Sequence, residues 1–174
     1  TLEDVLGTDS EFLAADASLL PADLTLGSIA IGDSPEVIWS GGAGDQAVST
    51  GENWRELAAP RAGDTLVFAG TSGLAVTNNL AEGTPLGAVR FAPDAGAFSL
   101  SGAGVVIEDG GAITNRSSDL QTLELDLEAA GALRLDAEAG PMDLNGAIEL
   151  ATTDSLQLDG AGDLTLAGPV SGAG

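Results

Sequence analysis

The chain has 174 residues, with 27 Asp and Glu against five Lys and Arg, which gives a formal net charge of −22. All five basic residues are Arg, and there is no His or Cys, which excludes a Ser-His-Asp triad, a catalytic thiol, a Schiff-base lysine, an imidazole or thiolate metal site and a disulfide. The negative charge argues against nucleic acid and anionic lipid as partners, because both are polyanions.

Residues 1–36 are the least regular part of the sequence, and we predict an N-terminal lead there. Residues 9–20 predict a short amphipathic helix, with Asp9 or Ser10 as the N-cap and Pro21 as the stop. The stretch 24–31 then alternates like a strand. We interpret the lead as a cap or tether, with a partner-binding segment as the alternative. Its candidate assembly residues are Leu24, Leu26, Ile29 and Ile31.

Residues 37–70 contain both tryptophans and are predicted to form a capping module. Trp39 and Trp54 lie near turn glycines, which favours the core of a small capping layer over stacking on sugar rings. Asn53 is interpreted as a clamp between side chain and backbone in a turn, rather than as a ligand contact.

Residues 71–174 are predicted to be β-helical repeats, because from residue 86 onward they consist of short segments that alternate with period two and end at Gly, Asp or Asn. Hydrophobic residues make up 44% of the chain but aromatic residues only 3%, so the core is expected to be aliphatic. Strands this short need neighbours on both edges. The predicted strands are 123–127, 133–135, 142–144, 156–158 and 164–166.

An internal repeat indicates how these strands are arranged. The pattern from Leu133 to Ile148 recurs from Leu156 to Val170, offset by 23 residues at its start and by 22 at its end, and a looser copy runs from 98 to 113. Three short strands per period with Gly-rich corners predict an all-β fold, a right-handed parallel β-helix. A β-sandwich or jelly roll is the alternative, although its strands need not recur in register.

Stacking in register places Asp136 and Asp159 one above the other, about 4.8 Å apart. Like charges at that separation repel by about 0.9 kcal/mol in water. We therefore predict that this pair is a weak site for a divalent cation such as Ca2+, and that stability rises with salt. The alternative is that the two carboxylates splay apart. No other cofactor is expected.

Six short motifs follow one another along the chain: W-S-G at 39–41, N-W at 53–54, P-x-x-G-D-x-x-x-F at 60–68, F-S-L-S-G at 98–102, G-x-I-T-N at 111–115 and L-T-L-x-G-P-V-S-G-x-G at 164–174. In this order they resemble the autotransporter-associated β-strand repeats of large exported bacterial proteins. The resemblance implies a secreted or surface-displayed β-helical passenger that is adhesive or structural, with no catalytic residues to carry over. It also implies an extracellular location at the bacterial cell surface.

The preferred function is a non-enzymatic building block of an extracellular fibre or sheath, in which copies of the chain join end to end by β-edge pairing. We expect Val170, on the last turn, to take part in this assembly together with the strand at 24–31. The rival function is a monomeric adhesin or passenger fragment that binds glycans or host surfaces. Membrane insertion is not expected, because no run of 18 apolar residues occurs.

A carbohydrate-active enzyme is the third possibility, because parallel β-helices host pectin-degrading enzymes. Glycoside hydrolysis needs two carboxylates about 5–10 Å apart across a cleft, and such an enzyme would show a carboxylate-lined groove on one face. Most Asp and Glu here lie at outward strand positions or in turns, which is typical of a solvated face. The chain is therefore not expected to be an enzyme.

Overall fold

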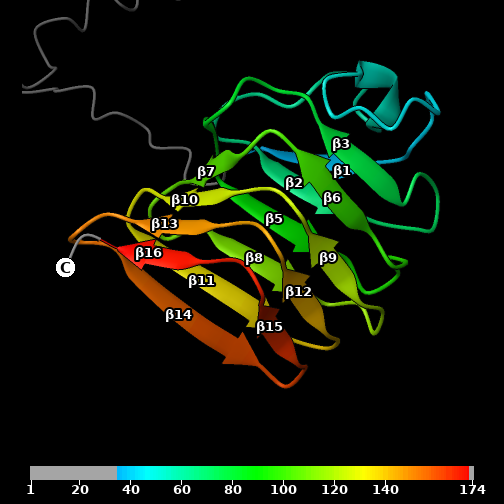
Figure 1. Cartoon of the computed structure of the whole chain (residues 1–174). Coiled ribbons are helices and arrows are strands. Elements are labelled where there is room, and N and C mark those ends of the chain that lie inside the picture. Colours follow the sequence, from blue (N-terminus) through cyan, green and yellow to red (C-terminus); the bar gives the residue numbers. More distant parts are fainter. Residues whose placement is uncertain (1–34, 173–174) are drawn as a thin grey trace, which may run out of the picture. The chain divides into compact units, whose positions relative to one another are not determined.

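The computed structural model describes residues 35–172, which belong to one compact unit of the chain (Figure 1). The helix predicted at 9–20 lies outside the described residues, as do the candidate assembly residues Leu24, Leu26, Ile29 and Ile31. In the described range, the only helical segment is the short 3-10 helix η1 (Gly51–Asn53).

The strands form three parallel sheets, which we call sheets A, B and C. Sheet A contains β1 (Glu36–Trp39), β2 (Thr65–Phe68), β5 (Ala88–Phe91), β8 (Ala112–Asn115), β11 (Ala132–Ala137) and β14 (Ser155–Gly160). Sheet B contains β3 (Ala75–Asn78), β6 (Ser99–Gly102), β9 (Gln121–Leu123), β12 (Met142–Leu144) and β15 (Leu164–Leu166). Sheet C contains β4 (Thr84–Leu86), β7 (Val105–Ile107), β10 (Leu127–Ala129), β13 (Ile148–Leu150) and β16 (Val170–Gly172).

The chain visits the three sheets in turn and so winds into a parallel β-solenoid of about five turns. Figure 1 shows the result in sheet A, where β5, β8, β11 and β14 lie side by side in chain order. The predicted parallel β-helix is therefore confirmed. A sandwich or jelly roll is excluded, because those folds stack antiparallel sheets face to face.

The residues that the sequence repeat aligns are paired with each other in the parallel sheets of the solenoid. Leu133 pairs with Leu156 in sheet A, and Met142 pairs with Leu164 in sheet B. In sheet C, Ile148 pairs with Val170. The predicted offsets of 23 and 22 residues are therefore the lengths of one turn, and equivalent apolar side chains stack directly on one another.

One predicted strand is wrong. The alternation over 123–127 predicts a single strand, but Leu123 ends β9, Leu127 begins β10, and the three residues between them form a corner. Leu125 in this corner is as buried as its neighbours in the strands. An alternation of apolar residues reports which side chains point inward, and that pattern continues around a tight corner, so it does not separate strand from corner.

The core is aromatic in the first turns and aliphatic in the later ones. Trp39 and Trp54 pack edge to face with ring centroids 5.1 Å apart, and both are fully buried, as predicted for a capping layer. Phe68 packs against both rings, and the Trp54 indole N–H donates to the Val48 carbonyl at 2.8 Å. The apolar cavity in this core measures about 20 Å3, which is too small for an organic ligand.

Candidate functional site

The predicted stacking of Asp136 on Asp159 is present, but an arginine lies between their carboxylates. Asp136 and Asp159 are paired in the register of β11 and β14. The Arg134 guanidinium contacts the Asp136 Oδ2 at 2.8 Å through Nη2, and the Asp159 Oδ2 at 2.8 Å through Nε. A charge of opposite sign therefore already bridges the two carboxylates that the sequence predicts to repel each other.

This bridge shifts the titration of two of its members. Hydrogen bonding to Arg134, and then to Gln157, holds the pKa of Asp159 below its ordinary value. The hydrogen bond to Asp159 raises the pKa of Arg134. In the described residues, no group of three or more Asp or Glu is arranged to hold a metal ion. Cation binding at Asp136 and Asp159 stays a prediction. The Arg134 guanidinium already contacts both carboxylates, as a bound cation would.

A groove of about 200 Å3 lies along sheet C and is lined by carboxylates, the kind of feature expected for a carbohydrate-active enzyme. Its acidic residues are Glu82, Asp126, Glu128 and Glu149. Two of them hold neighbouring turns together: Glu82 Oε1 accepts from the Gly104 N–H at 3.1 Å, and Asp126 Oδ1 accepts from the Ala147 N–H at 2.7 Å.

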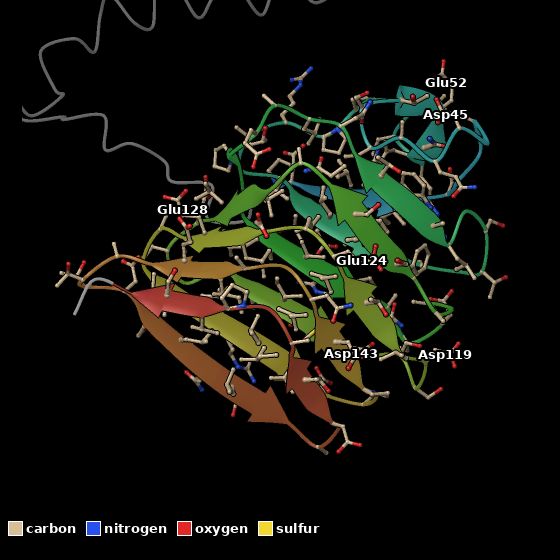
Figure 2. The ribbon with its side chains drawn as sticks, viewed as in Figure 1. Asp45, Glu52, Asp119, Glu124, Glu128 and Asp143 are labelled. Atoms are coloured by element: carbon tan, nitrogen blue, oxygen red, sulfur yellow. The ribbon has the colours of Figure 1, made fainter. Side chains whose placement is uncertain are left out.

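The acidic side chains are otherwise spread over separate parts of the molecule. Figure 2 shows Glu52 on η1 with Asp45 close by, Glu128 on β10, and Asp143 on β12 at the other side of the coils. Such a distribution is typical of a solvated surface rather than of two carboxylates that face each other across a cleft.

At the N-terminal end of the solenoid, the outer edge of β1 is covered. The Ile38 N–H donates to Glu56 Oε2 at 3.0 Å, and the Ile38 carbonyl accepts from the Arg55 N–H at 2.8 Å. Trp39 and Trp54 form an antiparallel bridge beside this pair. Both hydrogen-bonding groups that Ile38 directs away from β2 are therefore satisfied, and no strand can add here without displacing the segment around Glu56.

The outer edge of sheet B is also covered at this end, by residues 46–48. The Val48 N–H donates to the Thr77 carbonyl at 3.0 Å, and the Thr77 N–H donates to the Gln46 carbonyl at 2.9 Å. The outward groups of Ala47 are satisfied in turn by two side chains. Its N–H donates to Asp45 Oδ1 at 3.1 Å, and its carbonyl accepts from Asn53 Nδ2 at 3.0 Å.

In sheet C, the edge of β4 is covered by residues 61–64. The Gly63 N–H donates to the Pro85 carbonyl, and the Gly87 N–H donates to the Asp64 carbonyl, each at 3.0 Å. We call residues 40–64 the N-terminal cap. Because this cap covers β1, β3 and β4, all three sheets are closed at this end.

Asn53 is the clamp of the cap, as the sequence predicts. It is fully buried; its Oδ1 accepts from the Ala43 N–H at 2.9 Å, and its Nδ2 donates to Asp45 Oδ1 at 2.6 Å. Thr50 Oγ1 donates to Asp45 Oδ2 at 2.7 Å. The hydrogen bonds from Thr50, Ala47 and Asn53 together hold the pKa of Asp45 below its ordinary value.

The C-terminal end differs, because within residues 35–172 no strand pairs with the outer edges of β14, β15 and β16. Leu135 is 0% exposed, but Leu158, one turn later in the same row, is 52% exposed. Ile148 is 1% exposed, but Val170 in the same row is 47% exposed. Among residues 35–172, these two side chains occupy core positions that have a neighbour on one side only.

Backbone N–H groups of the last described turn also point away from the solenoid. In the preceding turn, the Ile148 N–H donates forward to the Pro169 carbonyl and the Met142 N–H donates forward to the Asp163 carbonyl, each at 2.9 Å. By the same register, the N–H groups of Val170 and Leu164 point away from the solenoid. We call the outer edges of β14, β15 and β16 the open edge.

Comparison of the sequence with protein-family models and with curated proteins, and of the structure with solved structures, gives no match. The resemblance to autotransporter-associated repeats therefore stays a prediction from the motifs. None of the helical segments in the described range is long and apolar enough to cross a membrane.

Sequence reasoning predicted the register that pairs Asp136 with Asp159 but missed Glu56 and the role of Arg134. The part of Val170 in assembly stays a prediction. The signal for Arg134 was present, because a residue two positions before Asp136 lies on the same face of a strand. Glu56 carries no comparable signal, because its contact with Ile38 depends on how an irregular loop folds back over β1.

Proposed function

We propose that this chain is a non-enzymatic extracellular structural protein, a building block of a surface fibre or sheath that assembles end to end by pairing of β-edges. The observation that carries the proposal is the half-exposure of Leu158 and Val170 in rows that are otherwise buried. The extracellular location is supported by the repeat motifs and by the absence of Cys.

Addition of a strand layer to the open edge has two favourable contributions. It buries apolar side chains, at up to about 1.5–3 kcal/mol for each one that becomes fully covered, and it gives partners to the outward N–H groups of Val170 and Leu164. The net charge of −22 opposes the approach of a second copy. Assembly is therefore expected to be stronger at high salt, where this repulsion is screened.

The test compares the oligomeric state of the full chain and of edge variants by analytical ultracentrifugation and negative-stain electron microscopy. Wild type should form rods whose length grows with protein and salt concentration, and Leu158→Lys should remain monomeric because it places a charge in the open apolar row. Leu120→Lys is the matched control, since Leu120 is an exposed leucine outside the strands. Wild type that stays monomeric under all these conditions would overturn the proposal, and so would rods that survive Leu158→Lys.

A monomer that binds glycans through its sides is the alternative outcome. It would be recognised by binding of the full chain to a glycan array, with Leu158→Lys binding as well as wild type. In that case the repeats act as an adhesive surface and the open edge takes no part.

A carbohydrate-active enzyme is a second candidate, favoured only by the groove along sheet C. Glu128 and Glu149 are the groove carboxylates for which the structure shows no hydrogen bond to the backbone of a neighbouring turn. If the groove hydrolyses glycans, wild type should release reducing sugar from a polysaccharide panel, and Glu128→Gln should abolish the release. An inactive wild type argues against this candidate.

A further inference from the structure

We infer that Asn145 is a site of spontaneous deamidation, at which the side-chain amide is lost and part of the product is isoaspartate. This inference goes beyond the proposed function and does not depend on assembly, because it concerns the chemistry of one corner of the solenoid. Three observations lead to it: the glycine that follows Asn145, the lack of hydrogen bonds at the reacting groups, and the close stacking of this corner on its neighbours.

Asn145 precedes Gly146 in the corner between β12 and β13. At such a pair the glycine nitrogen loses its proton to the solvent and attacks the asparagine Cγ, and the bond from Cγ to Nδ2 breaks as ammonia leaves. Water then opens the cyclic imide at one of its two carbonyl carbons. The net reaction converts asparagine and water into ammonia and either aspartate or isoaspartate. Glycine favours the attack, because it has no side chain to hinder the approach and its backbone adopts more conformations than that of any other residue.

The chain has five asparagines, and Asn145 differs from the other four in its hydrogen bonds. In those four the side-chain amide both accepts at Oδ1 and donates from Nδ2, and none of them precedes a glycine. They are Asn53, Asn78, Asn79 and Asn115. The Asn145 side chain is exposed and makes no hydrogen bond within residues 35–172, and the Gly146 N–H donates to no group of that range. The attack therefore breaks no hydrogen bond of the described fold.

Two Asp-Gly pairs, at 109–110 and 159–160, can form the same cyclic imide, but both carboxylates are engaged. The first accepts from the Ala132 N–H at 2.8 Å. The second accepts from Arg134 Nε at 2.8 Å, and this hydrogen bond holds the pKa of Asp159 below its ordinary value. A carboxyl group must be protonated to lose water, so a lowered pKa slows the reaction. The asparagine pair is therefore expected to react first.

The corner has no room for the isoaspartate product, in which the backbone runs through the side-chain carbons and is longer by one methylene group. A Cβ added at Gly146 would lie 2.0 Å from the Leu125 carbonyl oxygen of the turn before. A Cβ added at Gly168 would lie 1.9 Å from the Gly146 carbonyl oxygen, so the next turn is stacked just as closely. The extra methylene must therefore displace the corner. We expect it to break the hydrogen bond from the Asn145 N–H to the Leu123 carbonyl, which is 2.7 Å long.

Trypsin separates Asn145 from the other asparagines for the test, because it cuts after each of the five arginines and peptide 135–174 contains Asn145 alone. The folded full chain is incubated in mildly alkaline buffer, sampled over time, digested and analysed by mass spectrometry for the conversion of amide to carboxyl. Peptide 135–174 should convert several-fold faster than the other asparagine-containing peptides and give two products that chromatography resolves. Conversion no faster than that of peptide 62–90, whose Asn79 is also exposed, overturns the inference.

The same incubation in guanidinium chloride shows whether the fold permits the reaction. The unfolded chain should convert at Asn145 as well, because the Asn-Gly pair is then unconstrained. Conversion in the folded chain at a measurable fraction of the unfolded rate supports the inference. Conversion in the unfolded chain alone would mean that the corner holds Gly146 away from the side chain, and the inference would be wrong.

Two variants separate the added charge from the lengthened backbone. Asn145→Gln keeps an amide but forms its cyclic imide much more slowly, because the ring is larger, so its melting temperature should not change on incubation. Asn145→Asp carries the charge of the product without the extra methylene. Incubated wild type should melt below both fresh wild type and fresh Asn145→Asp. If converted wild type melts at the same temperature as Asn145→Asp, the corner tolerates isoaspartate and the inferred displacement is wrong.

Discussion

Arg134 neutralises two carboxylates that the repeat places one above the other. Asp136 is buried, with a side chain 6% exposed, and Arg134 Nη2 is 2.8 Å from it. Replacement by glutamine leaves this buried charge and Asp159 without the guanidinium, so we expect Arg134→Gln to lower the melting temperature. Arg116→Gln should lower it less, because Arg116 and Glu138 are both about half exposed.

The response to calcium shows whether Asp136 and Asp159 can bind a cation when Arg134 is removed. Millimolar calcium should raise the melting temperature of Arg134→Gln more than that of wild type, because the ion then substitutes for the lost positive charge. The comparison is made by circular dichroism in a buffer of constant ionic strength. An equal response of the two proteins would mean that Asp136 and Asp159 do not bind the ion.

Asp45 makes the stability of the N-terminal cap depend on pH. Its pKa in the folded protein is lowered by hydrogen bonds from Thr50, Ala47 and Asn53. Because the folded value lies below the unfolded value, which is about 3.9, the carboxylate stabilises the fold above that pH. The stabilisation is lost as the pH falls through the folded value. Asp45→Asn should be less stable than wild type at neutral pH, with a smaller further loss below about pH 4. An identical acid dependence in the two proteins would contradict this.

At the scale of the element, the cost of shortening a leucine should depend on its turn. Leu135→Ala should destabilise the protein by about 2–5 kcal/mol, because it leaves a cavity in a fully buried row. Leu158→Ala removes the same atoms from the same row but should cost much less in dilute monomer, since Leu158 is half exposed. Urea unfolding of both variants measures the difference. Equal losses would mean that the last turn is covered in solution.

The strands and their register could be predicted from the sequence because a solenoid repeats the same inward positions in every turn. The match of Leu133 with Leu156 is visible as a sequence offset and is the physical register of sheet A. The corner at 124–126 and the cover over β1 could not be predicted. Corners keep the same alternation as strands. The cap depends on contacts such as that between Ile38 in β1 and Glu56, 18 residues later in an irregular loop.

At the scale of the whole molecule, excess negative charge is expected to limit stability. With 27 acidic and five basic residues, the folded chain concentrates a net charge of −22. Raising the salt from about 0.01 M to about 1 M shortens the screening length from about 30 Å to about 3 Å. The melting temperature should therefore rise with sodium chloride and to the same extent with choline chloride. A flat response would mean that repulsion does not limit stability.

The placement of both tryptophans in the first turn makes them a local optical probe. Trp39 and Trp54 are the only tryptophans of the chain, and they lie at the opposite end of sheet A from β14. Their emission therefore reports on the closed end alone, whereas far-ultraviolet circular dichroism averages over every turn. If the open turn frays before the rest, the ellipticity changes at a lower temperature than the fluorescence, and the gap between the two curves measures how cooperatively the solenoid melts.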